Sequence, residues 1–252
     1  MKLRSLLALL LCLCALSGTG SFAEKTHFAL TARDCGPCKK LLGNVEILLV
    51  FVDTPAHPWT QKQKDAVFRV SWSSIDHMHK NAKKYNANLH LTFSYLEFGV
   101  STEFSSDLAW YWEIIHNVYH ENSITQVNAR YRRDLGVDDA PMIFLFNSWD
   151  LSHTYVCYND YPGWDEEFCV IFCDTKMNDN YLTHELYHQY GAIDLYDYHG
   201  EGIQRLANRY FPNNVMACTG VSLDDLSAYL IGFTDKLSDK AKEFLSKIDG
   251  KR

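Results

Sequence analysis

The stretch "YLTHELYHQYGAIDLYDY" at residues 181–198 contains two histidines, His184 and His188, four positions apart. Residues with this spacing lie on one face of an α-helix, so both imidazoles can reach a single metal ion. Glu185 lies about a hundred degrees around the helix, where its carboxylate can reach a water held on that ion. A chance H-E-x-x-H is expected only about 0.02 times in a chain of this length and composition. The stretch therefore predicts a helix that carries a metal site.

The residues after this helix complete the predicted site. Gly191 permits a left-handed turn that ends the helix and sends the chain back toward the metal. Asp194 then supplies a hard oxygen ligand, which makes His184, His188 and Asp194 the candidate metal ligands. Three protein ligands with one position left for water are typical of catalytic zinc, so we expect one Zn²⁺ ion with Glu185 as the general base. The alternative is a solvated helix face whose histidines have ordinary partners.

The pattern H-E-x-x-H-x-x-G-x-x-D resembles the zinc-binding signature of the metzincin metallopeptidases. It has the form with aspartate as third ligand, found in snapalysin-like and immune-inhibitor-A-like secreted bacterial proteases, whereas most metzincins have histidine in place of Asp194. The family also has a methionine in a tight turn under the metal, and Met216 in the segment N-V-M-A fits that role. Some members place a zinc-proximal tyrosine two residues later, where this chain has Cys218. The specific resemblance covers residues 184–216.

The resemblance implies an α+β fold of the zincin type. A twisted mixed sheet with backing helices would carry the active-site helix, followed by an irregular lower subdomain. A peptide substrate would add to an edge strand beside that helix, and residues 167–173 are expected to form this edge. The implied activity is that of a zinc-dependent endopeptidase, with Glu185 as general base for a zinc-activated water. Candidate oxyanion donors cannot be ranked from sequence: Tyr187, Tyr190, Tyr196, Tyr198 and His199.

The first half of the domain has a strand–helix–strand pattern. Residues 44–53 form an apolar run, which predicts a strand covered on both faces. Thr60 can cap a helix that runs to about Tyr85, and residues 88–98 alternate like a second strand. This order predicts a parallel pair of strands with a helix across it. We expect the helix to bury a stripe of five residues: Phe68, Trp72, Ile75, His79 and Ala82.

The second half contains weaker patterns, from which we expect one domain over residues 44–252. Its upper lobe would extend to about residue 191 and its lower lobe over 192–252, with an N-terminal arm at 24–43 ahead of both. We expect a helix from about Ser106 to Tyr119, followed by a polar connection. Strands are predicted at Pro141–Asn147 and Glu167–Cys173, with a loop at Tyr155–Trp164 between them. After the motif helix, an irregular segment would extend to Gly220, followed by helices near Leu223–Ile231 and Ser238–Ile248 that Ser222 and Ser238 would cap.

The N-terminus and the charge indicate an exported protein. Residues 1–23 combine two basic residues, a short apolar run and small residues that end at Ala23, which is the layout of a cleaved signal peptide. That run is too short to span a bilayer. The net charge is −7, and removal of Lys2 and Arg4 with the leader brings it to −9. Because there is no basic run, we expect no nucleic acid or membrane partner, and instead a secreted monomer that acts on proteins or peptides.

Six cysteines remain after the leader, and an even number in an exported chain favours disulfides, whose pairing the sequence leaves open: Cys35, Cys38, Cys157, Cys169, Cys173 and Cys218. Cys35-Gly36-Pro37-Cys38 is also the active-site tetrapeptide of thioredoxin-like redox proteins, although no convincing strand precedes it. A cysteine ahead of the domain could alternatively bind the zinc in a latent form. The remaining alternative, a zinc-binding module without activity, has no need of the Glu185 carboxylate.

Overall fold

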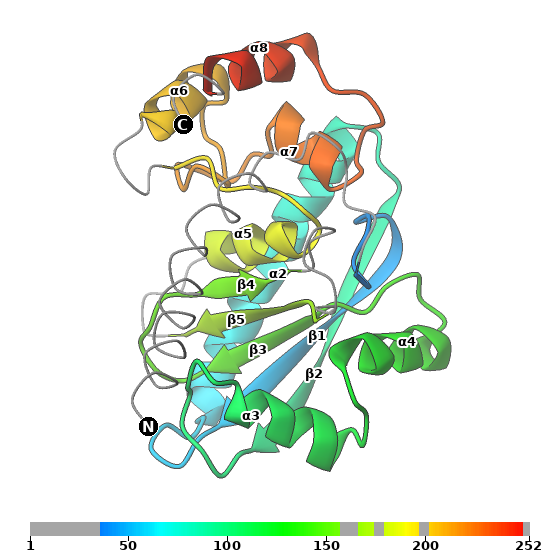
Figure 1. The fold of residues 1–252 in the computed structure, drawn as a ribbon, viewed down its shortest axis with the longest axis vertical. Coiled ribbons are helices and arrows are strands. Elements are labelled where there is room, and N and C mark those ends of the chain that lie inside the picture. The colour runs from blue at the N-terminus through cyan, green and yellow to red at the C-terminus, as the bar shows by residue number, and fades with distance from the viewer. Residues whose placement is uncertain (1–35, 157–165, 174–178, 197–201, 249–252) are drawn as a thin grey trace, which may run out of the picture. The chain divides into compact units, whose positions relative to one another are not determined.

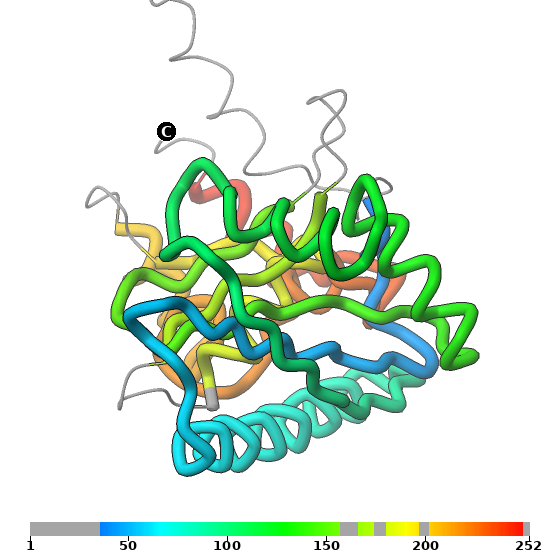
Figure 2. The backbone as a smooth tube through the Cα atoms, turned by 90° about the horizontal axis from the view of Figure 1, so that it is seen from below, coloured from blue at the N-terminus to red at the C-terminus, as the bar shows by residue number. Residues whose placement is uncertain are grey.

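The computed structural model describes residues 36–156, 166–173, 179–196 and 202–248. The predicted signal peptide and most of the N-terminal arm lie outside these ranges. The described part is an α+β structure built on one five-stranded mixed sheet. Helices cover both faces of this sheet, as the view along it shows (Figure 2).

The predicted strand–helix–strand opening is confirmed. β1 (Gly43–Asp53) and β2 (Leu89–Gly99) pair in parallel along their whole length, and α2 (Gln61–Lys84) connects them. Thr60 caps α2 as expected, because its hydroxyl accepts a hydrogen bond from the Gln63 backbone while the Thr60 backbone donates one to the Gln63 side-chain oxygen. β1 lies inside the sheet, and the residues of its apolar run are almost fully buried.

The face of α2 that packs on the protein differs from the predicted stripe. Ile75 and Ala82 are buried as expected, but the Trp72 side chain is 57% exposed. β2 is an edge strand, so this part of α2 lies over the margin of the sheet, where the Trp72 ring contacts Phe93 in a tilted arrangement with the ring centres 4.6 Å apart. The buried face is instead lined by Lys64, Val67, Ser71, Ser74, Ile75, Met78, Asn81 and Ala82.

Three short helical elements cover the opposite face of the sheet. α3 (Ala109–Trp112) continues into a π-helix, η1 (Glu113–Val118), so the helix predicted from Ser106 begins three residues later than expected. α4 (Ile124–Leu135) lies in the segment predicted as a polar connection. Ser123 caps its start, and Gly136 ends it in a left-handed conformation. Most of its side chains are polar, and its buried face consists of Ile124, Val127 and Asn128.

The remaining strands correct the prediction of the sheet's edge. β3 (Met142–Phe146) and β5 (Phe168–Phe172) are both present, and the strand order is β2-β1-β3-β5-β4. β5 is therefore an inner strand, and the expectation that residues 167–173 form the edge is wrong. The edge is β4 (His153–Tyr155), which pairs antiparallel to β5 and includes the first residue of the predicted loop. Side chains on both faces of β5 are buried, as an inner position requires.

Aromatic side chains fill the core between the sheet and α3. Trp110 packs edge-on against Phe146 at 4.9 Å, and Tyr111 stacks on Phe168 at 4.5 Å. Both helix residues are fully buried. Large rings of this kind bury much apolar area, so this cluster anchors the π-helical segment to β3 and β5.

The C-terminal segment, residues 202–248, contains three helices (Figure 1). α7 (Asp225–Leu230) and α8 (Asp239–Ile248) confirm the two predicted terminal helices. Asp224, and not Ser222, caps α7, whereas Ser238 accepts from the Ala241 backbone as expected. α6 (Ile203–Tyr210) lies in a stretch predicted to be irregular, and Phe211 at its end packs on Phe244 of α8 at 5.3 Å.

Asn81 of α2 connects three parts of the structure. Its amide nitrogen donates to the Tyr187 hydroxyl at 3.1 Å and to the Val221 carbonyl at 3.0 Å. Its amide oxygen accepts from the Leu223 backbone at 3.0 Å. The side chain is buried, so these bonds replace its hydration and tie the C-terminal segment to α2.

Two of the six cysteines are free thiols within the described residues, namely Cys169 and Cys218. Cys169 is fully buried, and its thiol lies 3.2 Å from the Glu185 carbonyl oxygen and 3.2 Å from Gln189 Oε1. The expectation of disulfides is therefore wrong for these two residues. Cys35 and Cys157 lie outside the described residues.

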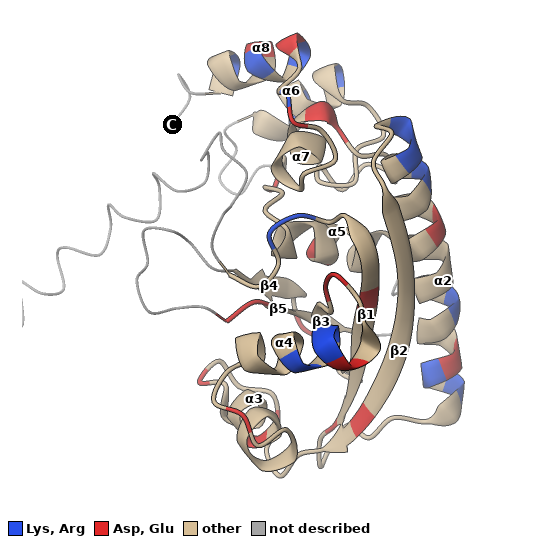
Figure 3. Ribbon diagram, turned by 90° about the vertical axis from the view of Figure 1, so that its right-hand side faces the viewer, with Lys and Arg blue, Asp and Glu red and all other residues tan. Residues whose placement is uncertain are grey.

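Charged residues of both signs alternate along the outer side of α2 (Figure 3). Two lysines, Lys83 and Lys84, lie in its last turn, where positive charge is favourable. Because charges of both signs alternate, the surface of α2 presents no continuous basic face.

Among the described helices, none is long and apolar enough to cross a membrane.

Candidate metal centre

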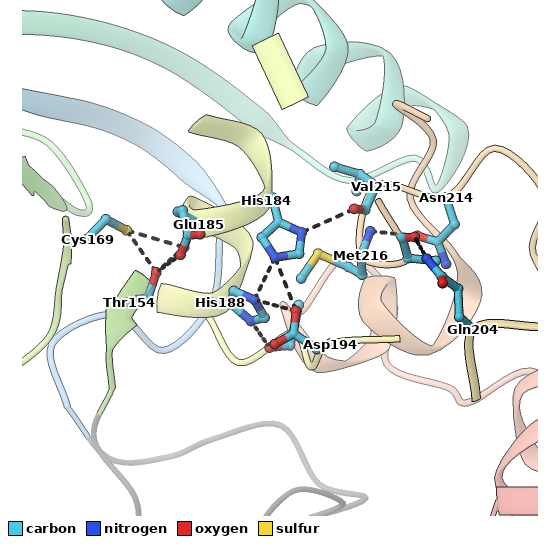
Figure 4. Close-up of polar contacts among 12 residues, drawn as sticks. Thr154, Cys169, His184, Glu185, His188, Asp194, Gln204, Asn214, Val215 and Met216 are labelled. Atoms are coloured by element: carbon cyan, nitrogen blue, oxygen red, sulfur yellow. Dashed lines mark hydrogen bonds and ion pairs between the residues drawn. The ribbon is translucent and has the colours of Figure 1, made fainter. Parts of the chain in front are cut away.

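α5 (Asp179–Gln189) carries the two histidines that the sequence singles out. It packs against α2, β4 and β5, and Leu182, Leu186 and Tyr187 are fully buried in that contact. Because these apolar residues fix the rotation of the helix, His184 and His188 are held together on another face (Figure 4). Burial on several sides makes α5 a rigid support for the two imidazoles.

Gly191 turns the chain at the end of α5, as predicted. Its φ of 103° lies in a region that side chains rarely allow. The Gly191 backbone donates to the His188 carbonyl at 2.9 Å, and the Ala192 backbone donates to the Tyr187 carbonyl at 3.0 Å. These bonds close the helix and direct the following residues back along it, which brings Asp194 to the histidines.

The three candidate ligands converge. Asp194 Oδ1 lies 3.1 Å from His184 Nε2 and 3.0 Å from His188 Nε2, and the two Nε2 atoms are 3.0 Å apart. Ligand atoms around a tetrahedral zinc ion with bonds of ~2.0–2.1 Å are separated by roughly 3.3 Å. Shifts of a few tenths of an ångström would therefore open this triangle to an ion. Among the described residues, this is the one group of three or more potential metal ligands.

Both histidines are oriented by backbone carbonyls. His184 Nδ1 lies 3.1 Å from the Val215 oxygen, and His188 Nδ1 lies 2.8 Å from the Ala192 oxygen. A carbonyl oxygen only accepts hydrogen bonds, so each Nδ1 carries the proton. Each Nε2 can then offer its lone pair to a metal, and a backbone carbonyl is a usual partner for a metal-binding histidine.

Electrostatics couple Asp194 to the histidines. Burial of Asp194 opposes its ionisation, but hydrogen bonds from His184 and His188 outweigh this effect and hold the pKa of the carboxyl far below its usual range. Burial likewise lowers the pKa of His188, but the hydrogen bond and charge of Asp194, with the charge of Glu185, raise it overall to about 9. Without a metal, Asp194 is therefore negatively charged at neutral pH, and His188 carries a second proton, on Nε2, in addition to the one on Nδ1.

Glu185 lies on the side of α5 that faces the edge strand. Its carboxylate oxygen Oε2 accepts a hydrogen bond of 2.7 Å from the Thr154 hydroxyl of β4, and it is not among the converging ligands. Thr154 was missed by the sequence reasoning because β4 has only three residues. The β-branched and aromatic run His153-Thr154-Tyr155 was the available signal.

Met216 is fully buried in a tight turn beside the histidines. The Cys218 backbone donates to the Val215 carbonyl at 3.1 Å, and Cys218 itself has a positive φ of 54°. Asn214 holds the turn by accepting from the Met216 backbone at 2.9 Å. Figure 4 shows the Met216 side chain next to the His184 ring. The turn therefore lies beside the candidate metal ligands, and the role predicted for Met216 stays a prediction.

The tyrosines named as oxyanion donors separate into two groups. Tyr187 and Tyr190 point into the core, where Tyr187 contacts Asn81 and Tyr190 donates to Asp139 at 2.8 Å. Tyr196 stacks on His184 with ring centres 6.0 Å apart, so it alone of the described candidates lies at the site. Tyr198 and His199 lie outside the described residues.

Comparison with known proteins adds no identification. No protein-family model matches the sequence, and no curated protein is significantly similar to it. The chemistry open to this chain is therefore judged from the geometry around His184, Glu185, His188 and Asp194.

Proposed function

We propose that this protein is a zinc-dependent endopeptidase. The observation that carries the proposal is the orientation of His184 and His188, whose Nδ1 atoms are bonded to backbone carbonyls while both Nε2 atoms converge on Asp194. A partly buried carboxylate that only needed a hydrogen-bond partner could be satisfied by one histidine. Two histidines fixed in the ligand tautomer around one carboxylate favour a metal site.

The donor set suits zinc. Two imidazole nitrogens and one carboxylate oxygen would leave a fourth position open, as in catalytic zinc sites. Zinc bound there would supply the positive charge that acidifies a water and polarises a peptide carbonyl. Asp194 contributes negative charge to the set, and its low pKa keeps it ionised at neutral pH.

Glu185 is the proposed general base. It is adjacent to His184 on α5 but outside the ligand triangle, which leaves its carboxylate for proton transfer. It would take a proton from the attacking water and deliver it to the leaving amine nitrogen. A site that only binds metal needs no carboxylate here, which argues against a non-enzymatic zinc module.

The fold is compatible with the metzincin resemblance. The sheet ends in an antiparallel strand, β4, that lies beside the motif helix, and Met216 occupies a buried turn next to His184. One side of β4 has no strand partner in the described residues. We infer that an extended peptide pairs with β4, in place of the inner strand β5 that the sequence indicated.

The redox alternative lacks its structural context. In thioredoxin-like proteins the cysteine pair opens a helix, whereas here Cys38 is fully buried and followed by β1, which begins at Gly43. Secretion and the signal peptide at residues 1–23 remain part of the proposal, as do a monomeric state and protein or peptide substrates.

Substitution of Glu185 tests the proposal. We expect Glu185→Gln to abolish chelator-sensitive cleavage of a proteome-derived peptide library while zinc content stays near one ion per chain. Glu243→Gln, on the exposed surface of α8, is the matched control and should cleave normally. Full activity of Glu185→Gln would refute the assignment of the base. A wild-type protein that binds zinc but cleaves no peptide would instead support the non-enzymatic module.

A further inference from the structure

A threonine on the edge strand contacts the proposed general base. We propose that Thr154 is a positioning residue, which holds Glu185 by one carboxylate oxygen and leaves the other free for proton transfer. The inference rests on the proposed peptidase function. It adds a residue that lies 30 positions before the motif and in a different element of the fold.

Strand pairing brings Thr154 to the helix. Thr154 on β4 lies opposite Cys169 on β5, and directly opposed residues of antiparallel strands project to the same face of the sheet. That face meets α5. The Thr154 hydroxyl lies 3.0 Å, and the Cys169 thiol 3.2 Å, from the backbone carbonyl oxygen of Glu185. Both strands therefore contact the backbone from which the Glu185 side chain extends, and the single hydroxyl proton of Thr154 remains available for the carboxylate.

Of the two contacts that the Thr154 hydroxyl makes with Glu185, the one with the carboxylate is shorter. Thr154 Oγ1 lies 2.7 Å from Glu185 Oε2, a normal distance for a hydroxyl that donates to a carboxylate. Within the described residues, Thr154 is the hydrogen-bond donor to this carboxylate. Glu185 is 5% exposed, so little water competes for the contact. A hydrogen bond to a charged acceptor is stronger than one between neutral groups, and this one restricts the rotation of the carboxylate.

The division between the two oxygens fits proton transfer. The O–H bond of the attacking water would break and its proton would move to Glu185 Oε1, after which Oε1 would return that proton to the leaving nitrogen. Oε2 remains an acceptor for Thr154 in both protonation states, because a carboxylic acid protonated at one oxygen still has lone pairs on the other. Thr154 keeps its own proton throughout. Its hydroxyl therefore acts through Glu185 and exchanges no proton with the water or the substrate.

Because Thr154 belongs to β4, a peptide that binds to this strand would also affect the position of Glu185. A peptide that pairs with β4 would order the backbone of His153–Tyr155, and the hydroxyl that holds Glu185 belongs to that backbone. A shift of about 1 Å in a positioning group can cost a hundredfold in rate. Loss of the Thr154 hydroxyl should therefore lower kcat and leave KM nearly unchanged.

Two substitutions at position 154 test this inference. Thr154→Val keeps the shape of the side chain and removes the hydroxyl, while Thr154→Ser keeps the hydroxyl. With a fluorogenic peptide chosen from the wild-type cleavage sites, we expect Thr154→Val to lower kcat about tenfold or more, with KM within about twofold and zinc near one per chain. Thr154→Ser should stay within about threefold of the wild type.

Ser152→Ala is the matched control, because the Ser152 hydroxyl accepts from the Phe172 backbone at 3.1 Å in the same edge segment and does not contact Glu185. It should leave kcat within about twofold. A Thr154→Val enzyme with wild-type kcat, or equal losses in the Val and Ser variants, would overturn the inference while the peptidase stands. If Thr154→Val does not fold, Thr154→Ala is judged by the same criteria. Failure of the wild type to cleave would count against the proposed function itself.

Discussion

The Nδ1 atom of His188 lies 2.8 Å from the carbonyl oxygen of Ala192, four residues later in the chain. This candidate ligand is thus oriented by the backbone of the turn that follows its own helix. The turn exists because Gly191 adopts a φ of 103°. The orientation of a proposed metal ligand and the conformation of one glycine are therefore linked.

Replacement of Gly191 should weaken both stability and zinc binding. Alanine at this φ is strained by about 1–3 kcal/mol, and relief of the strain would move the Ala192 carbonyl away from His188. We expect Gly191→Ala to lower zinc affinity about tenfold, measured by competition with a chromophoric chelator. Gly99→Ala is the control, since its Cβ would meet open space. Unchanged affinity would show that the Ala192 contact does not orient the ligand.

Removal of the third ligand should empty the site. Asp194→Ala leaves two imidazoles and deletes the negative charge, so we expect zinc affinity to fall by at least ~100-fold. Zinc content after dialysis measures this directly. Retention of zinc at wild-type affinity would point to Asp197 or His199 as the true ligand.

Zinc binding should release a proton. The raised pKa of His188, about 9, means that the metal-free site is protonated at pH 7, and zinc must displace that proton. Calorimetry at pH 7 in buffers of different ionisation enthalpy should report about one proton released per ion. Affinity should rise with pH up to about 9, so a flat profile between pH 6 and 9 would contradict the prediction.

The same proton should stabilise the metal-free fold. Because the folded pKa of His188 lies above its ordinary value of 6.5, its contribution is complete below about pH 6.5 and disappears as the pH rises through about 9. We therefore expect the free energy of unfolding of the metal-free protein to fall between pH 6.5 and 9, in urea titrations. His188→Gln should remove this decline.

Met216 should matter mainly for packing. Its side chain is fully buried, so Met216→Ala should cost about 2–5 kcal/mol through the cavity that it leaves. Met216→Leu nearly conserves the volume and should cost less than about 1.5 kcal/mol, with zinc stoichiometry unchanged. Urea unfolding of the metal-free variants compares the two costs. Loss of zinc in the well-folded Leu variant would instead indicate a specific role for the sulfur.

The elements that depend only on nearby residues could be predicted from the sequence. The β1–α2–β2 unit follows from an apolar run, a capped helix and an alternating strand, and the spacing of His184, His188 and Asp194 predicted which residues would meet. Sheet order depends on long-range pairing, so the sequence could not tell that β5 is inner and β4 is the edge. α4 and α6 were not predicted, although each has buried apolar residues at helical spacing (Ile124 and Val127 in α4, Ile203 and Ala207 in α6), and the Thr154 contact depends on a strand of three residues.

Asn81 has a consequence for the motions open to the protein. With Tyr187, Val221 and Leu223 all bonded to one buried amide, α2, α5 and the C-terminal segment cannot separate without breaking several hydrogen bonds at once. These three hydrogen bonds therefore oppose a hinge motion at this point. On the proposed function, a polypeptide would reach an already formed site as an extended chain, so unfolded segments would be cleaved more readily than folded surfaces.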